Sequence, residues 1–157
     1  MNEYFVAWWN LENLFAAEDD PERHPWLQRH LGKELSGWNA DVLQTKLDNL
    51  ASVITRMNDG LGPDLLGVCE VENRAVLAQL VDKIQLPNRQ YEVVHHNSQD
   101  KRGIDVAFIY DSNQFRVNAS EVFHHVIQKR TATRDLFQVN FYTRSENNLL
   151  ILSLIHI

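Results

Sequence analysis

Apolar residues follow two different spacings along the chain. From Asp41 to Met57 they recur every three or four residues, which predicts an amphipathic helix, and the same spacing predicts a second helix from Ala75 to Ile84. Short apolar runs bounded by polar turns predict strands at residues 3–9, 65–69, 91–96, 104–110, 114–127 (one or two strands), 136–141 and 148–154. The order of strand, helix, strand, helix and then mostly strands predicts an α/β fold, with a mixed sheet flanked by helices.

A long segment, residues 16–38, interrupts this pattern. It is rich in charge and punctuated by proline and glycine. Connections of this length are unusual in a compact domain and are usually functional or poorly ordered. Trp26 and Trp38 predict that the segment is held against the body of the protein at a few points.

Two predicted strands end in polar, oxygen-bearing residues. Asn10 follows the apolar run at residues 4–9, and Glu70 follows the run at residues 65–69. A lone Asn after a strand is more often a turn residue, and a lone Glu is more often a solvated carboxylate. The predicted helix between the two strands favours a right-handed crossover that places both strands in one sheet. Asn10 and Glu70 would then meet at the edge where ligands bind, and would suit a hard cation such as Mg²⁺.

Basic residues and one acidic residue mark two further polar segments. Arg102 precedes Gly103 and could pair with a phosphate, while Asp105 opens an otherwise apolar strand and must be paired, exposed or functional. A hairpin with a surface Arg–Asp pair explains this segment equally well. Arg134 lies close to Lys129 and Arg130, which predicts either a phosphate-facing patch or a solvated turn.

Composition narrows the class of protein. A chain of 157 residues, 44% of them hydrophobic, fits one soluble domain. The net charge of −6 argues against broad attraction to nucleic acid or anionic membranes, so a polyanionic substrate would need a bound cation. No apolar stretch predicts membrane insertion, and nothing indicates an obligate protein partner. The single cysteine, Cys69, and the absence of a basic signal region predict a cytoplasmic protein.

Four segments together resemble the bacterial endonuclease/exonuclease/phosphatase family. They are residues 9–15, the helix from Lys46, residues 63–73 and residues 102–107. The resemblance implies half of a DNase I-like four-layer α/β sandwich and cleavage of phosphoester bonds assisted by Mg²⁺ (or Mn²⁺).

Carried over residue by residue, the resemblance implies that Glu70 ligates the metal and that Asn10 is its neighbour in the metal site. Arg102 and Asp105 match a motif that the family keeps near the site. We therefore expect Asn10, Glu70 and Asp105 to be catalytic residues and Arg102 to face the substrate phosphate; Arg134 is expected to face the phosphate as well, on account of the basic cluster around it.

The resemblance covers the first part of the family's pattern. The later segments of the family, which carry a catalytic His, a Gly-Asp-Phe-Asn-like motif and an Asp-His pair, have no counterpart before Ile157. We expect residues 1–151 to be the N-terminal part of such a domain. Residues 152–157 match what the end of a common transposase-based sequencing adapter encodes, so we expect a non-native tail. On this expectation the chain alone has negligible turnover.

Three functions are compatible with these observations. The first is metal-dependent hydrolysis of phosphodiester bonds by an endonuclease- or exonuclease-like enzyme, with nucleic acid or another phosphoester as substrate. The second is a phosphatase acting on a small phosphoester or a lipid headgroup. The third is a non-catalytic module that uses the edge of the sandwich to bind a partner.

Overall fold

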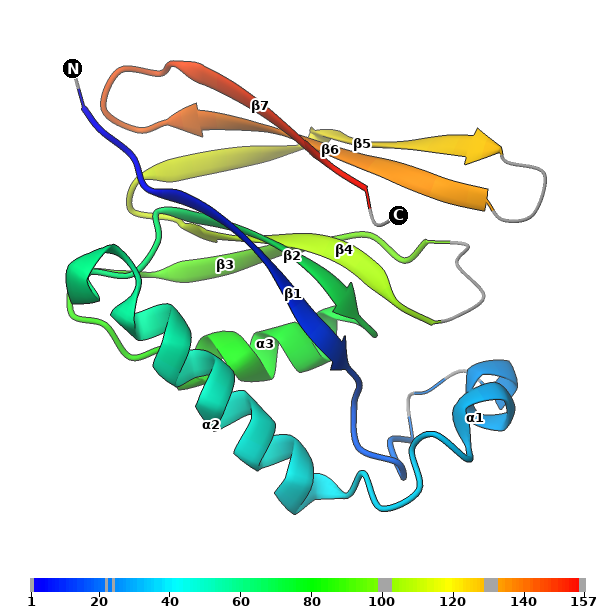
Figure 1. The fold of residues 1–157 in the computed structure, drawn as a ribbon. Coiled ribbons are helices and arrows are strands. Elements are labelled where there is room, and N and C mark those ends of the chain that lie inside the picture. Colours follow the sequence, from blue (N-terminus) through cyan, green and yellow to red (C-terminus); the bar gives the residue numbers. More distant parts are fainter. Residues whose placement is uncertain (1, 22, 24, 99–102, 129–132, 156–157) are drawn as a thin grey trace.

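Two β-sheets lie face to face, and helices cover the outer face of one of them (Figure 1). The computed structural model describes residues 2–21, 23, 25–98, 103–128 and 133–155. The first sheet contains β1 (Val6–Leu14), β2 (Leu65–Val71), β3 (Tyr91–His95) and β4 (Asp105–Asp111). The second sheet contains β5 (Phe115–Gln128), β6 (Thr133–Thr143) and β7 (Leu149–Leu154). The helices are α1 (Pro25–Leu31), α2 (Ala40–Arg56) and α3 (Arg74–Lys83), with a short 3₁₀ turn at Asn58–Gly60.

The first sheet brings the two predicted polar strand ends together. Its strand order is β1-β2-β4-β3, and β1 pairs with β2 in parallel through the α2 crossover. Asn10 lies opposite Cys69, so the carboxyl ends of β1 and β2 share one edge of the sheet. β4 runs antiparallel to both of its neighbours, which makes the sheet mixed.

Local sequence explains where the two long helices begin. The side chain of Asn39 accepts hydrogen bonds from the backbone N–H groups of Asp41 and Val42, and thereby caps α2. Asn73 caps α3 in the same way through the N–H of Val76. Both caps satisfy donors that a helix end otherwise leaves unpaired.

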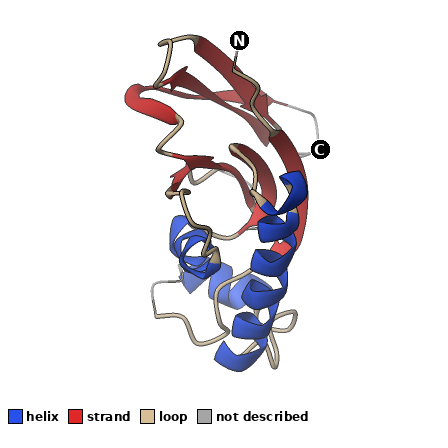
Figure 2. Ribbon diagram, turned by 90° about the vertical axis from the view of Figure 1, so that its left-hand side faces the viewer, coloured by secondary structure: helices blue, strands red, loops and turns tan. Residues whose placement is uncertain are grey.

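Two apolar cores hold the layers together, one between the helices and the first sheet and one between the two sheets. Leu47, Ile54 and Leu66 belong to the first core and are fully buried. The second core is largely aromatic: the ring of Phe108 lies 5.8 Å from that of Phe137 and 5.5 Å from that of Phe141. In the turned view of Figure 2, the helices (blue) gather in the lower part of the molecule and the strands of the two sheets (red) lie above them.

The predicted α/β class and the half-sandwich arrangement are confirmed, but several strands are longer than predicted. β1 and β2 continue past Asn10 and Glu70 to Leu14 and Val71, and the predicted stretch 114–127 forms one long strand, β5 (Phe115–Gln128), with a shift in register. None of the helices in the described part of the chain is long and apolar enough to cross a membrane.

Residues 16–38 contain the helix α1, which the sequence analysis missed. Pro25 stands at its first position, where its missing N–H costs nothing, and Leu27 and Leu31 face the core one turn apart. Trp38 holds the segment as predicted, since its Nε1–H donates to the Phe15 carbonyl at 3.0 Å. Trp26 is 39% exposed and stacks on His30 within α1.

We expect Leu66→Ala to destabilise the protein by about 2–5 kcal/mol, because it leaves a cavity in the core beneath the helices. The matched control is Leu61→Ala, since Leu61 is 63% exposed. The free energy of unfolding, measured in urea, should fall for the first variant and change by less than about 1 kcal/mol for the second. Equal losses in the two variants would contradict the assignment of this core.

Candidate functional site

The site lies where β1 and β2 end, and both strands are distorted there. The pairing register breaks between Asn10 and Leu14 on β1 and between Cys69 and Val71 on the β2–β4 pair. Among the described residues, the glutamates with positive φ are Glu12 (φ 54°) and Glu70 (φ 63°), and both lie in these breaks. A left-handed backbone costs a non-glycine residue about 1–3 kcal/mol and persists where the surroundings enforce it. The two bulges therefore give Glu70 a backbone direction that a regular strand would not.

Hydrogen bonds hold the Glu70 carboxylate from two sides. Asn10 Nδ2 donates to Oε1 at 2.9 Å, and the Asn13 backbone N–H donates to Oε2 at 3.1 Å. The Asn10 Oδ1 accepts from the N–H of Glu12 at 2.8 Å. The opposite orientation of the amide would set its oxygen against the carboxylate and its NH₂ against an N–H donor, so these contacts determine which way Asn10 faces.

Lys46 of α2 supports the distorted end of β1. Its Nζ donates to the carbonyl of Glu12 at 2.5 Å and to that of Asn13 at 3.5 Å, and it lies over the Trp38 ring. Burial lowers the pKa of Lys46, while the charges of Glu12 and Glu70 act in the opposite direction. The ammonium group thus donates to the carbonyls of Glu12 and Asn13, both of which have positive φ.

A buried ion pair ties the α1 segment to the end of β2. Arg23 Nε and Nη2 donate to the two carboxylate oxygens of Glu72 at 2.7 and 2.8 Å, and both side chains are almost fully buried. Arg23 also donates to the carbonyls of Ala16 and Glu18, and Glu72 accepts from the Ala16 N–H. Because Glu72 lies two residues after Glu70, this pair holds the α1 segment beside the candidate ligand.

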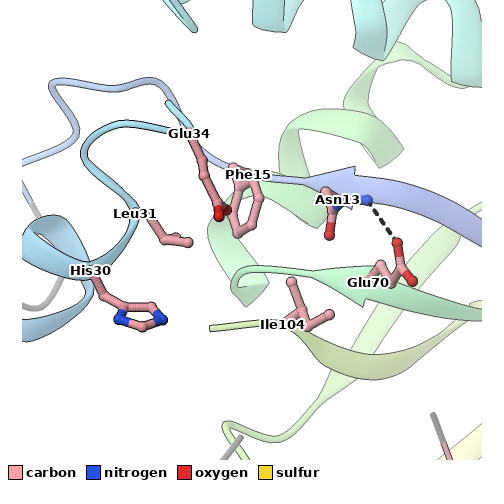
Figure 3. A pocket seen from close by; sticks show the side chains of 7 residues that line it. All are labelled: Asn13, Phe15, His30, Leu31, Glu34, Glu70 and Ile104. Carbon is pink, nitrogen blue, oxygen red and sulfur yellow. Dashed lines mark hydrogen bonds between the residues drawn. The ribbon is translucent and has the colours of Figure 1, made fainter. Parts of the chain in front are cut away.

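A pocket of about 320 Å³ opens between Glu70 and the α1 segment (Figure 3). On one side it is lined by Glu70 and Asn13 from the strand ends, with Ile104 and Phe15 contributing apolar surface. The opposite wall is formed by the end of α1 and the turn after it, through His30, Leu31 and Glu34.

The structure brings together some of the predicted site residues. Asn10 and Glu70 are in direct contact. Asp105 has partners of its own, because its carboxylate bonds the His95 ring at 3.1 Å and the N–H of Ser98 at 2.9 Å. Arg134 lies within β6 opposite Ile127, not before the strand as predicted. Arg102 lies outside the described residues. The catalytic role of Asp105 and the phosphate contacts of Arg102 and Arg134 stay predictions.

The chemistry of the strand ends fits a hard cation. Asn10 Nδ2 and the Asn13 N–H each hold one oxygen of the Glu70 carboxylate, a hard oxygen donor with about four lone-pair sites in all. Mg²⁺ is commonly held by one or two carboxylates, with water and substrate phosphate completing its shell. The described residues contain no group of three His, Cys, Asp or Glu side chains arranged around a metal. The metal-binding and catalytic roles of Glu70 and Asn10 stay predictions, although the contact between the two side chains is present.

Comparison with known proteins identifies the family. The sequence profile described as the endonuclease/exonuclease/phosphatase family matches residues 5–153. The chain belongs to this family. No curated protein is similar to the chain at a significant level.

Solved structures of the family share the fold. A family protein from Bacteroides thetaiotaomicron is 15% identical, with a TM-score of 0.58, and the match covers 98% of this chain and 51% of that one. A mannosyl-6-phosphatase from the same organism is 16% identical, with a TM-score of 0.57 and coverages of 99% and 52%. A family protein from Bacteroides vulgatus is 13% identical, with a TM-score of 0.59 and coverages of 98% and 52%. The chain spans about half the length of these relatives.

Sequence reasoning missed the residues that surround the Asn10–Glu70 contact. The position of Glu72 could have indicated an ion pair, because it directly follows an apolar strand residue and a buried carboxylate needs a partner. The helix from Lys46 was part of the resemblance, but neither the contacts of Lys46 nor those of Arg23 could be predicted, since their partners lie far away in the sequence. His30 and Glu34 were hidden because α1 was not predicted.

We expect Glu72→Gln to destabilise the protein by about 3–5 kcal/mol, because it leaves the buried Arg23 guanidinium without a counter-charge. Asp48→Asn is the control, since it removes the same charge from a solvent-exposed pair with Lys83 and should cost less than about 1 kcal/mol. Urea unfolding measures both. Similar midpoints for Glu72→Gln and the wild type would show that the buried pair does not hold the segment.

Proposed function

We propose that this chain supplies the cation-binding side of a phosphoester-hydrolysing site, with Glu70 as the ligand for Mg²⁺ or Mn²⁺. The observation that carries the proposal is the placement of Glu70 in a left-handed bulge, with both carboxylate oxygens held by neighbouring donors. Membership of the endonuclease/exonuclease/phosphatase family supports hydrolysis of a phosphoester as the reaction class. The proposal concerns a protein in which this chain and the rest of a family domain act together.

Each residue at the strand ends has a distinct part in this proposal. Glu70 holds the cation, which, when bound, polarises the phosphoryl oxygen and offsets charge on the leaving oxygen. Asn10 and the Asn13 N–H keep the carboxylate in one orientation, as supporting groups around metal ligands do. Lys46 keeps the Asn13 backbone in place through the Glu12 and Asn13 carbonyls.

Two candidate functions differ in the phosphoester that is cleaved: a phosphodiester in nucleic acid or a small phosphoester. Cleavage of phosphodiesters in nucleic acid would use the open strand ends, where Asn10 and Asn13 are exposed. The pocket favours the second candidate, a phosphatase acting on a small phosphoester. Its lining contains two carboxylates and, among the described residues, no lysine or arginine that would bind a polyanion. The net charge of −6 points in the same direction.

We expect Glu70→Gln to abolish Mn²⁺ binding by the chain, because the amide removes the charge that holds the cation. Asn10→Ala should weaken binding about tenfold, the usual effect of losing a group that orients a metal ligand. Titration calorimetry, or the loss of the free Mn²⁺ signal in electron paramagnetic resonance, measures both without relying on turnover.

Glu3→Gln is the control for this experiment, since Glu3 is exposed and lies before β1, at the opposite end of the strand from Asn10 and Asn13. It removes the same charge and should leave Mn²⁺ affinity unchanged. Unaltered Mn²⁺ affinity in Glu70→Gln would contradict the proposal and favour a non-catalytic binding module.

A further inference from the structure

We propose that the pocket beside Glu70 binds an uncharged, hydroxyl-bearing ring, a sugar attached to the phosphoester of the substrate. This inference rests on the proposed function, because the pocket receives whatever group is joined to a phosphate held at Glu70. The pocket begins at the Glu70 carboxylate and extends toward His30 and Glu34 (Figure 3). A phosphate bound through a cation at Glu70 would therefore lie at the mouth of this space, next to room for its ester group.

The polar groups of the pocket suit hydroxyl donors. Glu34 and Glu70 offer carboxylate oxygens, Asn13 an amide and His30 an imidazole nitrogen. Glu34 and Glu70 place two carboxylates in the described lining, and these disfavour a second phosphate or a carboxylate on the ligand. A neutral ring with several hydroxyl groups can donate to these acceptors at no such cost.

The apolar groups and the size of the pocket suit a single ring. Phe15, Leu31 and Ile104 are buried in the core of the α1 segment and present carbon surface to the pocket. A sugar ring carries C–H groups between its hydroxyls and matches such a mixed lining. A volume of about 320 Å³ lies at the low end of the roughly 300–1,000 Å³ found for small-molecule sites. It accommodates one ring and its substituents.

The wall opposite Glu70 is held in place before any ligand binds. The His30 ring stacks on Trp26, with the centroids 5.2 Å apart and the planes 10° from parallel. Arg23 joins the same segment to the core through Glu72 and donates to Gln28 of α1 at 3.1 Å. A wall fixed in this way loses little freedom on binding, and can discriminate between ester groups of different shape.

Equilibrium binding tests the inference independently of turnover. In the presence of Mg²⁺, glucose 6-phosphate, adenosine 5′-monophosphate and inorganic phosphate are each titrated into the wild-type chain, Glu34→Gln and His30→Ala. Both substituted residues are exposed, so the variants should fold. Glu3→Gln serves as the charge-matched control away from the pocket.

We expect at least one ring compound to bind about tenfold more tightly than inorganic phosphate, with Glu34→Gln removing most of this difference, as the loss of a hydrogen bond to a charged group does. His30→Ala should weaken the same compound several-fold, and neither variant should change the affinity for inorganic phosphate. Tighter binding of glucose 6-phosphate would indicate a free sugar phosphate as the substrate class, and tighter binding of adenosine 5′-monophosphate would indicate a nucleotide.

Three outcomes would overturn the inference: no detectable binding of either ring compound, equal affinity for inorganic phosphate and the ring compounds, or ring affinities within twofold of wild type in both pocket variants. Any of these leaves the cation site standing if Glu70→Gln still loses Mn²⁺. Retained Mn²⁺ binding in Glu70→Gln would instead refute the proposed function, so the two failures are distinguishable.

Discussion

The parallel pairing of β1 and β2, and the way it ends, is the constraint on which the candidate site depends. The strands pair regularly as far as Asn10 and Cys69, then the register shifts, and pairing resumes at Leu14 and Val71. Glu12, Asn13 and Glu70 adopt left-handed backbone conformations there, which a regular strand forbids. This departure turns the Asn13 N–H and the Asn10 amide toward Glu70. The backbone strain is thus located beside the carboxylate that we propose as the cation ligand.

The Arg23–Glu72 pair extends this arrangement beyond the strands. The pair is bidentate and buried. It joins the α1 segment to Glu72, which lies two residues after Glu70. The segment that carries His30 and Glu34 is thereby fixed relative to Glu70. A buried pair of this kind is poor evidence for net stability but strong evidence for a specific geometry, because either charge alone would be costly in the core. The proposed cation ligand and the pocket wall are therefore parts of one connected structure.

Periodicity and turn residues were enough to predict the α/β class, the two long helices and the shared edge of β1 and β2, because these follow from local patterns and from the handedness of the crossover. The contact between Asn10 and Glu70 followed from that topology. The bulges could not be predicted, since Glu12 and Glu70 have no intrinsic preference for positive φ. Lys46 and Arg23 find partners through tertiary packing, which no local pattern records.

Whether Glu70 holds a divalent cation decides the interpretation of this edge of the sheet. The most direct measurement is anomalous scattering from crystals of the chain soaked in Mn²⁺. The geometry predicts a peak about 2.1 Å from a Glu70 carboxylate oxygen, with water completing the shell, while Asn10 and Asn13 still donate to the same carboxylate. A peak elsewhere, or none at a concentration that saturates binding in solution, would contradict the assignment.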